Sequence, residues 1–152
     1  MFSKRKKKAK AKEYFNTVLS QPRVKTILRT IPHERAFHFY EDFGKPTGQT
    51  ATSLLDFRDK IKGAKSEQAR SSTLFHLKRG DFSNWIRDVI RDPELAEHIK
   101  EINYDSPRFR TKLSAVLEAR INQLRETVQR HTIVPEDSVV AHTLLEQPKA
   151  PR

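Results

Sequence analysis

Apolar residues recur at helical spacing in this chain, and that periodicity is the strongest constraint on its fold. The clearest case is a face formed by Phe82, Trp85, Ile86, Val89 and Ile90, at i, i+3, i+4, i+7 and i+8. A period near 3.6 residues places such side chains on one side of an α-helix. We therefore expect a mainly α protein, a compact multi-helix domain with at most one short strand or hairpin.

A long helix is expected over about 107–130, because Ser106 and Pro107 form a cap followed by a first-turn proline. Its apolar stripe extends over about five turns and consists of Phe109, Leu113, Val116, Leu117, Ile121, Leu124 and Val128. After His131 the periodicity ends and prolines become frequent. This pattern predicts a loose, extended C-terminal tail over 132–152.

Capping signals divide the middle of the chain into helices. A Ser or Asp side chain satisfies free amides at a helix start, and glycine commonly ends a helix. Starts are expected at Ser53 (with Asp56 completing a Ser-x-x-acid pattern), Ser66, Asp81 and Asp92 (followed by Pro93), and stops at Gly63 and Gly80. The last of these helices would carry Leu95, Ile99 and Ile102.

Two shorter helical patterns precede these. The first is formed by Tyr14, Phe15, Val18 and Leu19, and the second by Val24, Ile27, Leu28 and Ile31, between Pro22 and Pro32. The expected organisation is therefore a basic arm over 1–12, a helical domain over 13–131 and the C-terminal tail.

Aromatic residues crowd the segment 36–43, which contains no proline or glycine. That composition favours an extended strand, although a helical turn packing the same rings is nearly as compatible. Gly44, Pro46 and Gly48 then predict a loop. The loop lacks the Gly-x4-Gly-Lys-Ser/Thr pattern of a nucleotide phosphate loop, so ordinary turn chemistry is the default interpretation. Lys45 and Thr47 would touch a phosphate only if the loop faced RNA.

The segment 37–102 resembles a small domain family of archaea and bacteria that has no assigned activity. The residues that carry the resemblance are Phe37 to Tyr40, Gly44, Gly48, Ala51 to Leu54, Phe57, Phe75 to Phe82, Trp85 to Ile90, Asp92, Glu94, Leu95 and Ala96. Membership would imply a small helical module and no particular reaction. The insert over 65–72 is longer than the spacer expected in this family. The basic arm and the long helix lie outside the resemblance.

Positive charge is concentrated at the N-terminus. Seven of the first twelve residues are cationic, namely Lys4, Arg5, Lys6, Lys7, Lys8, Lys10 and Lys12. The whole chain has a net charge of +11, whereas without those seven it has 23 basic and 19 acidic residues, a net charge of +4. Like charges at this density repel, so the arm is expected to be disordered when free and to order on a polyanion. A transit peptide is the competing interpretation, but such peptides are usually rich in Arg and Ser.

Three cations on the second helix have no nearby acid before Glu34, and three near the start of the long helix form a locally unbalanced cluster next to Asp105. They are Arg23, Lys25 and Arg29, and Arg108, Arg110 and Lys112. We add them to the candidate nucleic-acid-binding residues. The other basic clusters are interspersed with acids, as on a solvated helix face.

Other chemistry has weaker support. His76, Asp81 and Trp85 suggest a His–Asp pair beside an aromatic ring, but no nucleophile or third orienting group accompanies them. The spacing of His38, Glu41 and Asp42 matches no standard metal site. Cysteine is absent, which excludes disulfides and thiolate ligands. We expect no metal, no cofactor and no catalytic residue.

These observations predict a non-enzymatic, cytoplasmic RNA-binding protein that associates with ribosomal RNA and ribosomal proteins through its arm. No apolar run approaches the ~20 residues of a membrane span, and no secretory signal follows the basic start. Three alternatives stay open: a protein-interaction module, including a homo-oligomer paired through the 107–130 helix, a DNA-binding accessory factor, and an enzyme acting through His76. No stacking platform, zinc finger or basic zipper is present, so recognition would use backbone and shape.

Overall fold

The computed structural model describes residue 15 and residues 18–142, with side chains up to residue 130. The elements in chain order are α2 (Gln21–Leu28), a 3-10 turn (His33–Arg35), β1 (Phe37–Asp42), β2 (Lys45–Ala51), α3 (Leu54–Lys62), α4 (Glu67–Arg79), α5 (Asp81–Trp85), a π-helix (Ile86–Ile90), α6 (Pro93–Lys100) and α7 (Phe109–His142). The expectation of a mainly helical domain with one hairpin is confirmed for these residues. The predicted arm and the last ten residues lie outside them.

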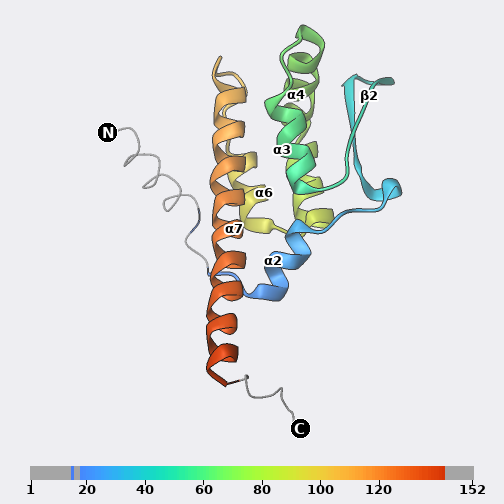
Figure 1. The fold of residues 1–152 in the computed structure, drawn as a ribbon. Helices are drawn as coiled ribbons and strands as arrows, with labels where there is room; N and C mark the ends of the chain where they lie inside the picture. Colours follow the sequence, from blue (N-terminus) through green and yellow to red (C-terminus); the bar gives the residue numbers. More distant parts are fainter. Residues whose placement is uncertain (1–14, 16–17, 143–152) are drawn as a thin grey trace.

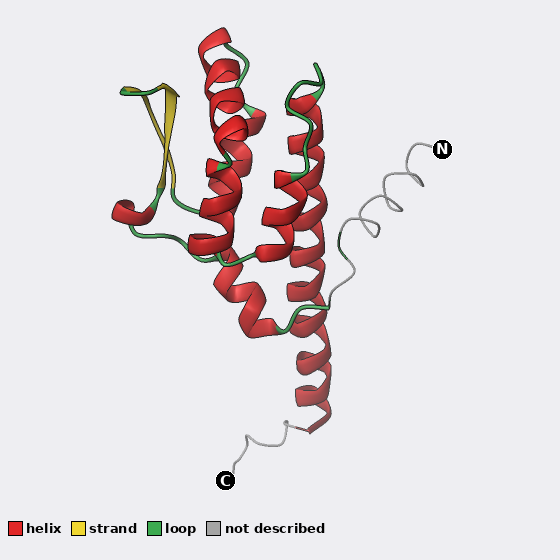
Figure 2. Cartoon of the chain, turned by 180° about the vertical axis from the view of Figure 1, so that it is seen from behind, coloured by secondary structure: helices red, strands yellow, loops and turns green. Residues whose placement is uncertain are grey.

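The helices stand roughly side by side, with the hairpin on one flank. Figures 1 and 2 show α7 as a long column, α3 and α4 beside it, and the hairpin on the side of α3 and α4 that faces away from α7. The hairpin packs on α3 and α4, while α2, α3 and α6 contact α7. None of the helices in the described part of the chain combines the length and apolar character needed to cross a bilayer.

An aromatic cluster fills the core between the hairpin and the helices. Phe37 lies with its ring centroid 5.1 Å from that of Phe82, and Phe82 lies 4.9 Å from Phe57. Trp85 closes the cluster at 5.6 Å from both Phe37 and Phe57, and its indole N–H donates to the Arg35 carbonyl at 2.9 Å. Tilted and edge-to-face ring pairs add to the stabilisation from apolar burial. The residues expected on the 82–90 face therefore form the centre of the molecule.

Most of the predicted caps are present. Ser53 Oγ accepts from Asp56 N at 3.0 Å, and Asp56 Oδ2 accepts from Thr52 N at 3.0 Å. Gly80 ends α4 with φ +77°, a left-handed conformation that a side chain would strain. The prediction that Asp81 caps the next helix is wrong. Gly80 occupies the N-cap position of α5 and no side chain caps it.

The face over 82–90 is not one regular α-helix. After Trp85 the backbone widens into the π-helix, in which Arg91 N and Asp92 N both donate to the Ile86 carbonyl. Arg91 takes φ +77°, an uncommon conformation for a residue with a side chain. The wider turn leaves Ile86 and Ile90 fully buried and Val89 half-buried.

The strand interpretation of segment 36–43 is confirmed, whereas the loop predicted over 44–48 is wrong. A two-residue turn separates Asp42 from its partner Lys45, and β2 begins there. The register shifts on both sides of Tyr40, between His38 and Tyr40 and between Tyr40 and Asp42. Gly44 at φ +69° and Gly48 at φ +86° accommodate the turn and the irregularity.

Both ends of the helical domain differ from expectation. Leu19 is buried outside any helix and Val18 is 92% exposed, so residues 18–20 do not continue a helical stripe. At the other end α7 continues to His142, so the prediction of an extended tail is wrong over 132–142. A helix that is already nucleated gains one hydrogen bond per added residue, so loss of the apolar stripe does not itself end it.

Candidate nucleic-acid interface

The cationic arm lies outside the described residues, but the point where it joins the domain is well defined. The Phe15 side chain is 3% exposed. The Arg120 guanidinium lies over its ring at 4.5 Å from the centroid, and the His98 ring lies at 4.9 Å, edge to face. Gln123 Nε2 donates to the Phe15 carbonyl at 3.1 Å. Phe15, three residues after the arm, is therefore held against α6 and α7.

A buried ion pair supports this position. Arg120 Nε and Nη2 donate to Asp92 Oδ2 and Oδ1, each at 2.8 Å, and both side chains are fully buried. Asp92 Oδ1 also accepts from Leu95 N at 3.1 Å, which caps α6, and Arg120 Nη1 donates to Gln123 Oε1 at 2.6 Å. One aspartate thus caps a helix and pairs with α7, as charge-assisted bidentate geometry allows.

The sequence did not point to Arg120, which the charge pattern assigned to a solvated face. A signal was nevertheless present. Arg120 follows Val116 and Leu117 at i+4 and i+3 and precedes Leu124 by four, so it occupies a position within the apolar stripe. A charged residue at a core position is rarely buried without a partner.

The cations predicted on α2 divide into two groups. Arg23 and Lys25 are exposed, and neither side chain has a hydrogen bond or ion pair within the described residues. Arg29 instead donates to the carbonyls of Thr26, Val89 and Ile90. Because its guanidinium stabilises the end of the π-helix, we remove Arg29 from the candidate interface.

The second predicted cluster lies at the first turns of α7. Arg108 and Lys112 are exposed and Arg110 is half-buried. The first turn of α7 holds no acidic side chain, so these cations coincide with the positive end of the helix dipole. Residue 110 lies about 15 Å along the helix axis from Arg120, at 1.5 Å per residue. The structure therefore separates this cluster from Arg120, where Phe15 packs on α7.

Five further basic side chains are paired with acidic ones, in agreement with the solvated-face interpretation of their clusters. The ion pairs are Arg58 with Asp59 and Glu118, Lys60 with Asp56, Lys62 with Glu118, Arg79 with Asp81, and Arg87 with Asp88. Such surface pairs contribute little to stability, but they cancel the local field. Fewer basic side chains of the described domain are therefore available to phosphates than its composition suggests.

His76 is buried and both of its ring nitrogens are engaged. Tyr40 N–H donates to His76 Nε2 at 2.8 Å, and His76 Nδ1 lies 2.9 Å from Asp81 Oδ2. Since Nε2 accepts, the neutral ring carries its proton on Nδ1 and donates it to Asp81. Arg79 Nε also donates to Asp81 Oδ2, at 2.9 Å. This arrangement leaves no ring nitrogen of His76 open for proton transfer to a substrate.

Burial makes His76 a pH-sensitive part of the fold. Burial lowers the pKa of His76 below 6.5, outweighing the opposite effect of Asp81. The unfolded chain then takes up the proton first, so this stability is present above the unfolded pKa and is lost as pH falls towards the folded one. Between pH 7.5 and 5.5 we expect urea denaturation to show a loss of about 1 kcal/mol from this group.

A matched pair of variants isolates the His76 contribution. His76→Gln should flatten the pH dependence of the unfolding free energy, because the titrating group is removed. His33→Gln, at an exposed position, should leave the wild-type dependence in place. An unchanged pH profile in His76→Gln would show that other groups cause the loss.

The other sequence candidates have structural partners. His38 Nδ1 lies 3.3 Å from Thr50 Oγ1, and its ring packs on His33 at 5.2 Å. Thr47 Oγ1 donates to the Phe39 carbonyl at 3.0 Å, inside the hairpin. Across the described residues, no group of three or more His, Cys, Asp or Glu side chains is arranged to hold a metal ion.

Comparison with known proteins adds no relative. No protein-family model, curated protein or solved structure matches the chain. The resemblance of segment 37–102 to a small archaeal and bacterial domain family stays a prediction.

Proposed function

We propose that this chain is a non-enzymatic RNA-binding protein that docks on the ribosome or a similar ribonucleoprotein in the cytoplasm. The observation that carries the proposal is the segregation of charge. Seven cations precede residue 13, while the remainder of the chain has a net charge of only +4. Neutralising phosphates with such an arm releases condensed counterions, which is a large favourable term in binding nucleic acid.

The described domain supports this function in two ways. Phe15 is held between α6 and α7, so the arm is tethered at a buried anchor. Arg23 and Lys25 follow the anchor closely in the chain and extend the positive surface. The cations at the first turns of α7 provide a second contact area for phosphates.

We prefer RNA over DNA because the sequence contains no zinc finger or basic zipper, which leaves recognition through backbone and shape. Recognition of the phosphate backbone and of the overall shape suits folded RNA, because the narrow major groove of an RNA helix is inaccessible to protein side chains. The apolar stripe of α7 is used within the molecule, since Leu113, Leu117 and Leu124 are fully buried. A homo-oligomer paired through 107–130 would therefore have to use the polar face of that helix.

Sedimentation of a cell lysate tests the proposal. We expect the protein to co-sediment with ribosomal particles at moderate salt, and RNase treatment to release it. DNase treatment is the matched control and should leave the protein in the particle fraction. Release by DNase alone would indicate the DNA-binding alternative. A protein that remains in a high-mass fraction after both nucleases would indicate a protein partner, which size-exclusion chromatography with light scattering would then identify.

A further inference from the structure

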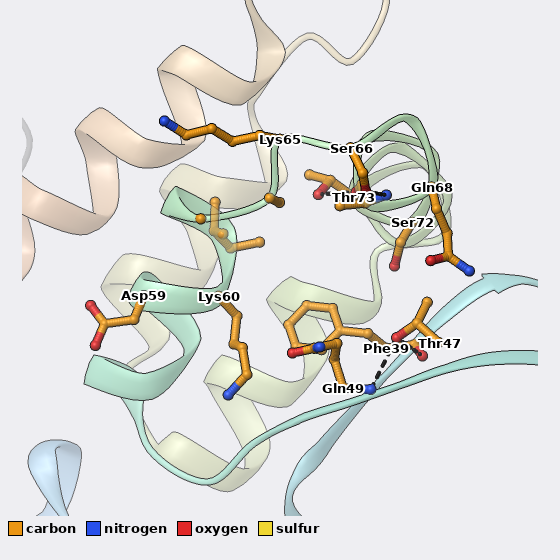
Figure 3. A pocket seen from close by; sticks show the side chains of 14 residues that line it. Phe39, Thr47, Gln49, Asp59, Lys60, Lys65, Ser66, Gln68, Ser72 and Thr73 are labelled. Atoms are coloured by element: carbon orange, nitrogen blue, oxygen red, sulfur yellow. Dashed lines mark hydrogen bonds between the residues drawn. The ribbon is translucent and has the colours of Figure 1, made fainter.

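A pocket of about 360 Å³ opens between the hairpin, the end of α3 and the first half of α4. Figure 3 shows Phe39, Thr47 and Gln49 on one side of the pocket and Ser72 and Thr73 on the other, with the side chains of Asp59 and Lys65 pointing outwards. The apolar part of the wall is formed by Phe39, Ile61 and Ala69, and the polar part includes Gln49, Gln68 and Ser72. The volume lies at the low end of the range for small-ligand pockets, which suits one or two fused rings.

One hydroxyl in this wall has no hydrogen-bond partner. Ser72 is 3% exposed, and its Oγ is a buried atom that meets no acceptor or donor in the structure. The hydroxyl of its neighbour Thr73 does have a partner, because Thr73 Oγ1 donates to the Ala69 carbonyl at 3.0 Å. Unpartnered buried hydroxyls are rare in native proteins and call for an explanation. A polar group of a bound ligand would supply the missing partner.

The remaining polar groups define the chemistry of that ligand. Within the described residues, the Gln49 side-chain amide makes no hydrogen bond, and Gln68 uses Nε2 on Glu41, which leaves Oε1 available. The charged residues of the wall are already paired, since Lys60 binds Asp56 at 2.9 Å and Asp59 binds Arg58 at 2.7 Å. The pocket thus offers hydroxyl and amide groups on an apolar surface and no unpaired charge at its wall except Lys65, which is exposed.

We infer that this pocket binds a nucleobase. A base combines an uncharged, flat body with an edge that carries both donors and acceptors, which glutamine amides match well. The exposed Lys65 would then meet the phosphate attached to that base. The inference rests on the proposed function for the source of the base, an unpaired nucleotide of RNA, because single-stranded segments present their base edges to proteins. A free nucleotide offers the same chemistry.

Titration of the full chain with nucleoside monophosphates tests the inference. With AMP, CMP, GMP and UMP as separate probes, we expect at least one to shift the side-chain amide NMR signals of Gln49 and Gln68. The dissociation constant should be about 1 mM or lower, as befits a ligand of this size. Ribose 5-phosphate, which lacks the base, should leave those signals in place. No shift with any nucleotide at about 10 mM, or an equal shift with ribose 5-phosphate, would overturn the inference.

Substitution of the unpartnered hydroxyl gives a second readout. Ser72→Ala should fold as the wild type does, because it removes a group that the free protein leaves unsatisfied, and should weaken nucleotide binding by about 5-fold. Ser71→Ala on the same helix is the matched control and should bind normally. If Ser72→Ala binds as tightly as the control, the hydroxyl does not contact the ligand and the inference fails.

Two further measurements distinguish RNA from a free nucleotide as the source of the base, and distinguish failure of the pocket inference from failure of the proposed function. A single-stranded tetranucleotide that binds more tightly than the best monophosphate indicates RNA as the source, and equal affinities indicate a free nucleotide. A chain lacking residues 2–12 should still bind monophosphates at the pocket. Nucleotide binding without ribosome association would overturn the proposed function alone. Ribosome association without nucleotide binding would overturn the pocket inference alone.

Discussion

Deletion of residues 2–12 is expected to weaken binding to structured ribosomal RNA strongly and to flatten its dependence on salt. Each phosphate contact contributes about 0.7 to 0.9 to the slope of log affinity against log salt. Seven arm cations that all contact phosphate would thus account for a slope of about 5 to 6. Affinity measured at low salt should fall by several orders of magnitude, because the arm supplies most of the counterion release.

Fluorescence anisotropy with a labelled rRNA fragment, repeated over a range of potassium chloride concentrations, measures both quantities. A shuffled arm of the same composition is the matched control and should retain the slope, since phosphate contacts need charge rather than sequence. Neutralising Arg23 and Lys25 by glutamine in the full chain should lower the slope by about 2 at most. The arm has no role in RNA binding if its deletion leaves affinity and slope as they were.

Substitution of Arg120 by methionine is expected to lower the free energy of unfolding by about 3 to 5 kcal/mol. The change leaves the Asp92 carboxylate fully buried with only the Leu95 amide as partner. An uncompensated buried charge is among the most destabilising defects in a fold. The same change removes the guanidinium that lies over Phe15, so the packing of Phe15 on α7 should weaken as well.

Urea denaturation of Arg120→Met and of Arg125→Met, an exposed arginine on the same helix, separates burial from helix propensity. The control should stay within about 0.5 kcal/mol of the wild type. Adding Asp92→Asn to Arg120→Met should restore part of the loss, because the orphaned charge is then removed. If Arg120→Met unfolds at the wild-type urea concentration, the buried pair does not hold α6 against α7.

The parts of the fold that local chemistry determines could be predicted from the sequence. Ser53 and Gly80 act within one or two turns of their own helices, so their roles are visible in short patterns. The strand over 37–42 depends on aromatic composition in the same local way. Asp81 shows the limit of this reasoning, because its carboxylate binds His76 and Arg79 in preference to the next helix start.

Contacts between distant segments could not be predicted in this way. Asp92 and Arg120 are separated by 28 residues, and Arg29 meets the π-helix carbonyls across about 60 positions of sequence. The charge pattern therefore placed both arginines on solvated or RNA-facing surfaces. The pocket at Ser72 was missed for a related reason, because its walls come from both strands of the hairpin and from α3 and α4. Arg23, Lys25, Arg108 and Lys112 are exposed, as local charge patterns can predict, because a solvated cation needs no tertiary partner; their role in binding stays a prediction.

The burial of Phe15 sets the range over which the leading cations can act. A chain spans at most about 3.3 to 3.6 Å per residue, so Lys4 stays within about 40 Å of the anchor whatever its conformation. When one part of a protein is bound to a partner, a tethered segment within this range has a millimolar effective concentration for sites on that same partner. If the body contacts RNA as proposed, the arm would then bind the same RNA in an intramolecular step. Under the proposed function, two individually weak contacts would combine into a longer-lived complex through avidity. Release of Phe15 would leave the arm attached at Leu19, the next buried residue, so it would lower the effective concentration only by lengthening the tether.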